Sequence, residues 1–149
     1  GAASRGACGV NERVVLTAVG RALTFAPGSM GSPRAVTCEE SAKGAECYTR
    51  GPAFEGHAFF PERANIEFTE AVSRTQLNVR VWERGSGETM ACGSGACAVL
   101  AAAVSAGLAE RRAQVALPGG ALTIEWRETD GHILMTGPAT PVFEGEVRV

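Results

Sequence analysis

The sequence predicts an α+β domain in which about eight short strands surround one buried helix. Apolar residues alternate in short segments along most of the chain, and turn residues separate these segments, a pattern typical of strands. Residues 96–108 are instead apolar on every side of a helical wheel, which indicates a helix inside the protein rather than on its surface. The 19 glycines occur in a chain of high apolar content and predict tight turns or close backbone approaches rather than disorder.

Short strands and turns are expected in the first part of the chain. Residues 14–19 carry apolar side chains at alternate and at intervening positions, which indicates a strand covered on both faces. Gly20-Arg21 is the turn that follows. The next segments are a return strand at 22–26, a turn at 28–33, a strand at 35–38 and an irregular stretch at 39–62 with a helical turn around 39–47.

Clearer strand patterns follow residue 62. Residues 64–72 are predicted as a strand, and residues 77–82 alternate strictly, which is the cleanest strand pattern in the chain. A polar, glycine-rich run from Glu83 to Gly95 leads directly into the apolar helix, for which Gly107 is the expected end. The remaining strands are predicted at 114–117, 121–127, 133–136 and 142–149, with turns at 118–120 and 130–131.

Composition excludes several classes of partner. The 149 residues suffice for one domain that buries about 70% of its unfolded surface without a disulfide or metal. A formal net charge of −2 argues against nucleic-acid and acidic-membrane partners. The longest apolar stretch is too short to span a bilayer, and residues 1–12 show no secretory signal pattern. We therefore expect a cytoplasmic domain with a flexible N-terminal entry at residues 1–12.

The cysteines and histidines do not predict a metal site or a disulfide framework. The cysteines are odd in number, and none of them forms a CxxC pair. They are Cys8, Cys38, Cys47, Cys92 and Cys97. The two histidines, His57 and His132, are far apart in sequence and lack ligand-type spacing.

Cys92 is the candidate reactive residue because it directly precedes the buried helix. Gly93-Ser94-Gly95 follows it, and these small residues allow a ligand to approach the backbone closely. The unpaired N–H groups and partial positive charge of a helix N-terminus bind carboxylates or phosphates and favour a cysteine in its thiolate form. The alternative interpretation is a small buried cysteine in a tight glycine turn.

Three better-known motifs resemble this stretch but do not match it. Residues 93–98 fit G-x-G-x-x-A, yet the residues before them are polar instead of forming a buried strand, so dinucleotide binding is not predicted. Cys92-Gly93-Ser94 opens like a papain-type protease signature, but the matching downstream histidine and asparagine are missing. No G-K-[ST] sequence is present, which excludes a P-loop.

Residues 82–98, WERGSGETMACGSGACA, resemble the second catalytic-cysteine motif of diaminopimelate epimerases. Three further segments agree with that family and occur in its order. They are FPERANI at residues 60–66, LPGG at 117–120 and MTGPA at 135–139. The resemblance covers about residues 20–149.

The resemblance implies both a fold and a reaction. Family members have two similar α+β halves, each a mixed sheet rolled into a barrel around one central helix, with the substrate held between the halves. They interconvert LL- and meso-diaminopimelate in lysine biosynthesis and use neither pyridoxal phosphate nor metal. Two cysteines on opposite faces of the α-carbon exchange its proton, because one base alone would return the proton to the face it came from.

Carried over by motif, the resemblance assigns a role to seven residues of this chain. Cys92 is one acid/base of the pair, and the backbone N–H groups of Gly93 and Ser94 bind the α-carboxylate. The distal amino and carboxylate groups of the substrate contact Asn65, Glu83 and Arg84. Ser32 stands where the family has a substrate-binding asparagine, in Gly31-Ser32-Pro33-Arg34 instead of Gly-Asn-Pro-His.

The partner cysteine of the family belongs to a first half that these 149 residues do not match. Cys8-Gly9-Val10-Asn11 echoes its motif, but the fourth position is not glycine and the spacing is too short, so the echo is treated as coincidence. We therefore expect residues 1–149 to be a single domain like the C-terminal half, inactive alone and able to dimerise through its uncovered face. The alternatives are a non-catalytic lone domain, a small-anion binder, and a racemase or isomerase related to proline racemases or phenazine-pathway enzymes. Without the family resemblance, Glu83, Arg84 and Asn65 would be interpreted as solvent-exposed residues at the rim of the domain.

Overall fold

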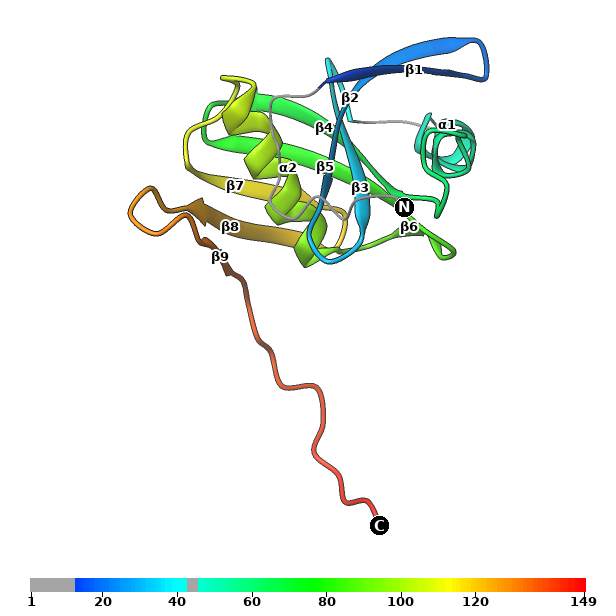
Figure 1. The fold of residues 1–149 in the computed structure, drawn as a ribbon. Helices are drawn as coiled ribbons and strands as arrows, with labels where there is room; N and C mark the ends of the chain where they lie inside the picture. Colours follow the sequence, from blue (N-terminus) through cyan, green and yellow to red (C-terminus); the bar gives the residue numbers. More distant parts are fainter. Residues whose placement is uncertain (1–12, 43–45) are drawn as a thin grey trace.

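The computed structural model describes residues 13–42 and 46–149, which form two helices and one nine-stranded sheet. The prediction of an α+β fold is confirmed (Figure 1). In chain order the elements are β1 (Val14–Ala18), β2 (Arg21–Ser29), β3 (Pro33–Glu39), α1 (Glu46–Glu55), β4 (Asn65–Ser73), β5 (Gln76–Glu83), β6 (Gly87–Thr89), α2 (Gly93–Ser105), β7 (Arg112–Leu117), β8 (Gly120–Trp126) and β9 (Ile133–Thr136).

The sheet is mixed, and each helix is the crossover between one parallel pair of strands. The strand order is β1-β2-β3-β4-β5-β7-β8-β9, with β6 paired to β5. The β3–β4 and β5–β7 pairs are parallel and all other pairs are antiparallel. Helix α1 joins the first parallel pair and α2 the second. Because the two pairs run in opposite directions, right-handed crossovers place the two helices on opposite faces of the sheet.

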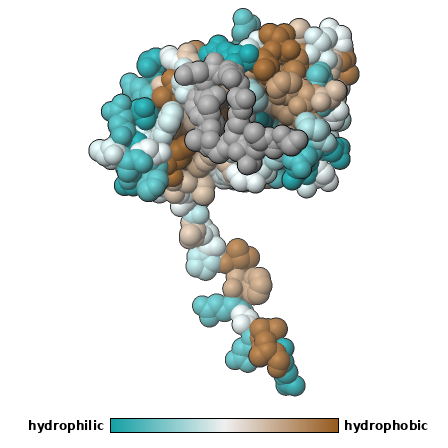
Figure 2. All heavy atoms as spheres, in the orientation of Figure 1, coloured by the Kyte–Doolittle hydropathy of each residue, from teal (hydrophilic) through white to brown (hydrophobic). Residues whose placement is uncertain are grey.

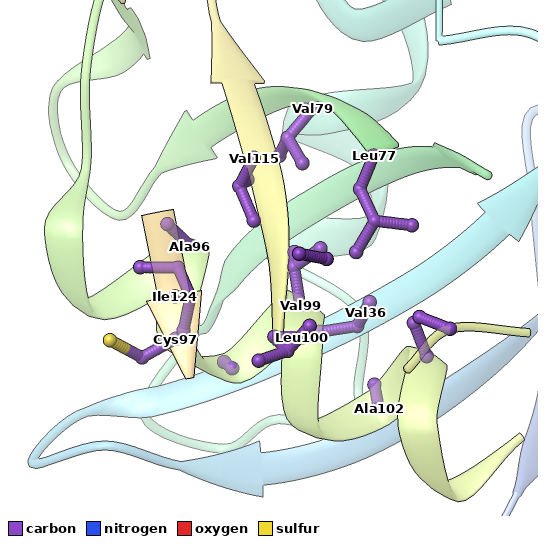
Figure 3. Close-up of a cluster of buried hydrophobic side chains, with 14 of the residues drawn as sticks. Val36, Leu77, Val79, Ala96, Cys97, Val99, Leu100, Ala102, Val115 and Ile124 are labelled. Atoms are coloured by element: carbon purple, nitrogen blue, oxygen red, sulfur yellow. The ribbon is translucent and has the colours of Figure 1, made fainter. Parts of the chain in front are cut away.

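The core is accordingly divided into two clusters, one under each helix. On β3, Val36 packs in the cluster around α2, whereas its neighbour Ala35 packs in the cluster around α1. The α2 cluster contains many small side chains, together with Leu77, Leu100 and Ile124 (Figure 3). The α1 cluster is aromatic, and the rings of Phe25 and Phe54 lie 4.9 Å apart between their centroids.

Helix α2 confirms the prediction of a buried apolar helix. Every residue from Gly95 to Ala103 is buried, and the helix contacts β2, β3, β4, β5, β7, β8 and β9. It begins three residues earlier than predicted, at Gly93, and ends at Ser105 with Ala106 as its C-cap. Gly107 follows with a φ of +73°, so the predicted glycine stop is correct. A position at the centre of a closed barrel stays a prediction.

The closed barrel itself is not observed. In the described part of the chain, β1 and β9 stand at the two ends of the strand order and do not pair, so the sheet is open. The first strand also differs from the expectation of two covered faces, because the Val15 side chain is 67% exposed. None of the described residues covers this side chain at the edge of the sheet.

One predicted helix was wrong in position, and one short strand was not predicted. The helix placed around 39–47 begins at Glu46 and continues to Glu55; it escaped detection because Gly51 and Pro52 lower helix propensity. Gly51 is required there, since an added Cβ would lie 2.5 Å from Cγ of Trp82. The three-residue strand β6 was also missed, because it lies inside the polar, glycine-rich run.

No strand forms at residues 142–149. This segment extends away from the body of the protein, with its apolar residues brown in Figure 2. Val142, Phe143, Val147 and Val149 are all more than four-fifths exposed. A strand needs backbone hydrogen bonds to a neighbouring strand, and this segment pairs with none of the described strands. Among the described residues, neither helix has the length and apolar character needed to cross a membrane.

Candidate active site

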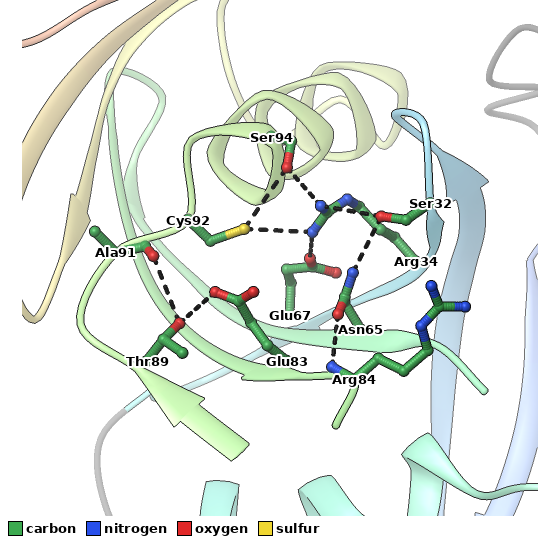
Figure 4. Close-up of polar contacts among 10 residues, drawn as sticks. All are labelled: Ser32, Arg34, Asn65, Glu67, Glu83, Arg84, Thr89, Ala91, Cys92 and Ser94. Atoms are coloured by element: carbon green, nitrogen blue, oxygen red, sulfur yellow. Dashed lines mark hydrogen bonds and ion pairs between the residues drawn. The ribbon is translucent and has the colours of Figure 1, made fainter. Parts of the chain in front are cut away.

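Polar side chains from four strands and one helix meet at the N-terminus of α2 (Figure 4). The parallel register places Arg34 beside Asn65, so the beginnings of β3 and β4 lie together. Ile66 pairs with Trp82, which brings the end of β5 to the same place. The group consists of Ser32, Arg34, Asn65, Glu67, Glu83, Arg84, Thr89, Cys92 and Ser94.

Cys92 is the N-cap residue of α2, as the sequence predicted. Its backbone is extended, with φ −148° and ψ 101°, and its side chain makes no capping hydrogen bond. The sulfur lies 3.7 Å from Oγ of Ser94. The residue is 9% exposed, which leaves the sulfur close to the surface of the site.

Arg34 is the centre of this group, a position that sequence analysis did not assign to it. Its Nη1 donates to Oε1 of Glu67 at 2.7 Å and to Sγ of Cys92 at 3.5 Å. Its Nη2 donates to Oγ of Ser94 at 2.5 Å and to Oγ of Ser32 at 3.3 Å. Arg34 is only 5% exposed and Glu67 is fully buried, so the ion pair is removed from water.

Burial acts in opposite ways on the two members of this pair. It raises the pKa of Glu67 to about 8, and the nearby Arg34 guanidinium opposes this shift. Burial also disfavours the charged form of Arg34, but the attraction of Glu67 and Cys92 outweighs it and raises the pKa of Arg34. The arginine therefore remains a permanent cation, whereas the carboxyl group can hold a proton near neutral pH.

Gly95 makes this close arrangement possible. A Cβ on that residue would lie 3.1 Å from Sγ of Cys92, 3.1 Å from Oε1 of Glu67 and 3.4 Å from Nη1 of Arg34. The glycine thus allows a thiol, a carboxyl and a guanidinium to pack over the first turn of the helix. This agrees with the expectation that glycines here permit a close approach, although the groups that approach are side chains of the same protein.

Asn65 joins two parts of the site. Its Nδ2 donates to Oγ of Ser32 at 3.3 Å, and its Oδ1 accepts from the backbone N–H of Arg84 at 2.7 Å. Glu83 accepts a hydrogen bond from the Thr89 hydroxyl, whereas the Arg84 side chain donates to the carbonyl of Glu62 at 3.1 Å. Glu83 and Arg84 therefore point to different surroundings, as expected for adjacent strand residues.

Glu55 supports the turn that carries these residues and was not found from the sequence. Its Oε2 accepts from Nε1 of Trp82 at 2.8 Å, and its Oε1 accepts from the backbone N–H of Gly85 at 2.9 Å. These two contacts lie immediately before and after Glu83-Arg84. Arg63 also forms an ion pair with Glu55, in which Nη2 lies 2.9 Å from Oε1. A glutamate in an irregular stretch gave no signal, because its role depends on a contact 27 residues away.

The other described cysteines take no part in the hydrogen bonds of this site. Cys97 is buried in the α2 cluster, and burial raises its pKa, consistent with the expected core role. Burial also raises the pKa of Cys47 to about 12. Cys38 is exposed on β3, and Cys8 falls outside the described residues. Within residues 13–42 and 46–149, no three side chains of metal-binding type are close enough to hold an ion.

Comparisons with known proteins agree with the motifs. A family model described as diaminopimelate epimerase matches residues 28–142. A diaminopimelate epimerase from Methanococcus maripaludis strain C6 is 50% identical over 134 residues, covering 90% of this chain and 48% of that protein. One from Acetivibrio thermocellus is 55% identical over 119 residues, covering 80% of this chain and 42% of that protein. The chain thus spans about half the length of the curated relatives it matches.

A solved structure supports the fold alone. A phenazine biosynthesis protein of the PhzF family from Enterococcus faecalis superposes with a TM-score of 0.51 at 20% identity, covering 66% of this chain and 35% of that one. The sequence matches are much closer than this structural one, and they identify the family. The chain belongs to the diaminopimelate epimerase family.

Proposed function

We propose that residues 1–149 form one domain equivalent to the C-terminal half of a diaminopimelate epimerase. Family membership supports the isomerase class, and the matched share of the relatives supports the half. The observation that carries the proposal is the Cys92 sulfur at the first turn of α2, 3.5 Å from a buried guanidinium. In this proposal the domain epimerises diaminopimelate only together with an N-terminal half, and alone it has little or no activity.

The reaction is a proton exchange at the α-carbon. Cys92 as a thiolate removes the proton, which forms an S–H bond and leaves the electron pair on the α-carbon and its carboxylate. A cysteine thiol of the N-terminal half then donates its proton to the opposite face, which inverts the centre and leaves that cysteine as the thiolate. Neither pyridoxal phosphate nor a metal takes part.

Substrate binding is assigned to groups around Cys92. The first-turn N–H groups of Gly93 and Ser94 would bind the α-carboxylate, and this charge complements the helix N-terminus. Glu83, Arg84 and Asn65 would bind the distal amino and carboxylate groups. Ser32, which Asn65 contacts, would lie beside them. The Ser32 hydroxyl already accepts hydrogen bonds from Arg34 and Asn65. We expect it to contribute less to binding than a longer amide would.

The cellular setting follows from the reaction. We propose a cytoplasmic enzyme of lysine biosynthesis whose only ligand is the small-molecule substrate, with no nucleic-acid or membrane partner. Exposed apolar residues of the C-terminal segment also favour self-association of the isolated domain, with a homodimer as the simplest product.

The test measures α-proton exchange and stereochemistry in deuterated, reduced buffer with LL- and meso-diaminopimelate. We expect no exchange with the chain alone. A fusion should exchange and invert the centre when it joins the unmatched part of the Methanococcus maripaludis epimerase to this chain. In that fusion, Cys92→Ser should abolish exchange, whereas Cys38→Ser, at an exposed cysteine away from the site, should leave it unchanged.

Four outcomes contradict the proposal. Exchange with inversion by the chain alone would mean that it contains both acid/base groups. An active Cys92→Ser fusion would remove the role assigned to Cys92. Turnover of proline or 4-hydroxyproline but not of diaminopimelate would favour a related racemase, and failure of every fusion to bind diaminopimelate by calorimetry would favour a non-catalytic domain.

A further inference from the structure

We propose that Arg34 is a further catalytic residue, whose guanidinium holds Cys92 as the thiolate while Glu67 positions that guanidinium. Cys92 then enters the reaction as the base. The proposal deepens the proposed function, on which it rests for the reaction, but the state of the sulfur can be measured without turnover. The two can therefore fail separately.

The guanidinium is held in one orientation by acceptors from three parts of the fold. Glu67 lies on β4, Ser32 precedes β3, and Cys92 and Ser94 begin α2. Nη1 donates to both Glu67 and Cys92, and Nη2 donates to both hydroxyls. A planar guanidinium with this many fixed acceptors cannot move away from the sulfur without losing several hydrogen bonds.

A buried cation requires an anion, and few groups can supply one here. Within the described part of the chain, the ionisable groups facing Arg34 or its partner Glu67 are Glu67 on β4, Glu83 on β5, and Cys92 and Cys97 at the start of α2. Burial favours the protonated form of Glu67 near neutral pH and the thiol form of Cys97. The charge of Glu83 acts on Glu67 through space without a hydrogen bond. Cys92, by contrast, accepts a hydrogen bond from Arg34 itself.

Glu67 and Cys92 therefore share one nitrogen, with distances of 2.7 and 3.5 Å to Nη1. When Glu67 is protonated, the negative charge that balances Arg34 resides on the Cys92 sulfur. When Glu67 is ionised, it competes for the same cation and weakens the thiolate. Arg34 is thus the group that stabilises the base, and Glu67 both positions and moderates it.

The arginine also distinguishes this chain from the histidine that the family motif carries at this position. A histidine can lose its charge near neutral pH, whereas an arginine cannot. The site therefore keeps a positive charge beside the sulfur at every pH at which the protein is folded. After Cys92 has taken the α-proton, Nη1 still has Glu67 as an acceptor, so the cation is not left without a partner.

The test uses the full 149-residue chain in reduced form and follows two signals against pH. One is thiolate absorbance near 240 nm, taken as the difference from Cys92→Ala; the other is the rate of iodoacetamide alkylation at Cys92, measured by peptide mass spectrometry. At pH 6.5 we expect Arg34→Gln to lower both signals about tenfold, because a charge-assisted hydrogen bond is lost. Arg34→Lys, which keeps the charge but loses the planar fork, should retain part of each signal.

Glu67→Gln provides the opposite and decisive change. It removes the competing anion but keeps the shape of the side chain, so the thiolate signal at pH 7.5 should rise above that of the unchanged chain. A merely structural ion pair would instead leave the signal unchanged or lower it. Unchanged pH profiles in a folded Arg34→Gln chain would overturn the proposal. If Arg34→Gln does not fold, a thiolate signal in Glu67→Gln at or below that of the unchanged chain would overturn it equally.

Discussion

Each face of the sheet buries an arginine–glutamate pair among the described residues, and the surroundings of these two pairs differ. On the α2 face, Arg34 and Glu67 lie 2.7 Å apart, with 5% and 0% of their side chains exposed. On the α1 face, Arg50 and Glu39 lie 2.8 Å apart, with 4% and 14% exposed. Burial and distance alone therefore do not separate the two pairs.

What separates them is the group beside each arginine. The Arg50 guanidinium lies over the Phe68 ring, 5.4 Å from its centroid, where it completes the aromatic core under α1. The Arg34 guanidinium instead contacts a thiol and two hydroxyls at the start of a helix. The comparison teaches that a buried ion pair indicates chemistry only where its charge faces a group that can react.

The largest expected effect tests this difference directly. In the fusion with an N-terminal half, Arg34→Gln should lower kcat for α-proton exchange about 100-fold or more, because a preorganised charge beside the reacting sulfur is lost. Arg50→Gln should leave kcat of the folded fraction within about twofold, since the catalytic groups keep their electrostatic surroundings. The measurement is the rate of deuterium incorporation at saturating diaminopimelate. Equal losses in the two variants would show that both pairs act only through the fold.

Local patterns explain which parts of the site could be predicted from the sequence. Cys92 and the Gly-Ser-Gly turn stand together in the chain, next to an apolar helix, so a short window was enough to find them. Arg34 and Glu67 are 33 residues apart and meet only because β3 and β4 pair in parallel. Glu67 lies in a strand segment buried on both faces, where a charged residue gives no periodic signal.

The same reasoning explains which parts of the fold were missed. Strand β5 was predicted closely because one alternating face is enough to define it. Helix α1 was misplaced because Gly51 and Pro52 satisfy tertiary packing at the cost of local propensity. The strand expected at 142–149 has the right alternation but pairs with no strand of the described chain. Its pattern alone could not supply the hydrogen bonds.

The second prediction concerns how stability depends on pH on the α2 face. The pKa of Glu67 is raised to about 8 in the folded protein, against an ordinary value near 4.5 when unfolded. Between these values the folded state holds a proton that the unfolded state has lost, so stability falls as pH rises and levels off above about pH 8. In the unchanged chain the slope should approach about 1 kcal/mol per pH unit, measured by urea unfolding from pH 5 to pH 8.

Two comparisons sharpen this result. Glu67→Gln should remove the slope, whereas Glu39→Gln, on the α1 face, should not. A slope of opposite sign in the unchanged chain would mean that Arg34 holds Glu67 ionised, and the assignment of the thiolate as the balancing anion would then be untenable.

The smallest expected effect concerns the two glycines that allow close approach on the two faces. In Gly51→Ala the new Cβ would lie 2.5 Å from Cγ of the Trp82 ring, which cannot move aside, so a loss of about 2 kcal/mol is expected. In Gly95→Ala the new Cβ would lie 3.1 Å from Sγ of Cys92, and a shift of a few tenths of an ångström would relieve the contact. Better helix propensity of alanine offsets part of the cost, so stability should change by less than about 1 kcal/mol.

The shift should nevertheless change the reactivity of Cys92, because the atoms that move are its sulfur, the Glu67 carboxyl and the Arg34 guanidinium. We expect a several-fold lower rate of Cys92 alkylation in Gly95→Ala with little change in the urea midpoint, and the reverse pattern in Gly51→Ala. If Gly95→Ala loses stability without losing reactivity, the glycine serves helix packing rather than the cysteine. The α2 face would then resemble the α1 face, and the functional difference between them would have to come from Arg34 alone.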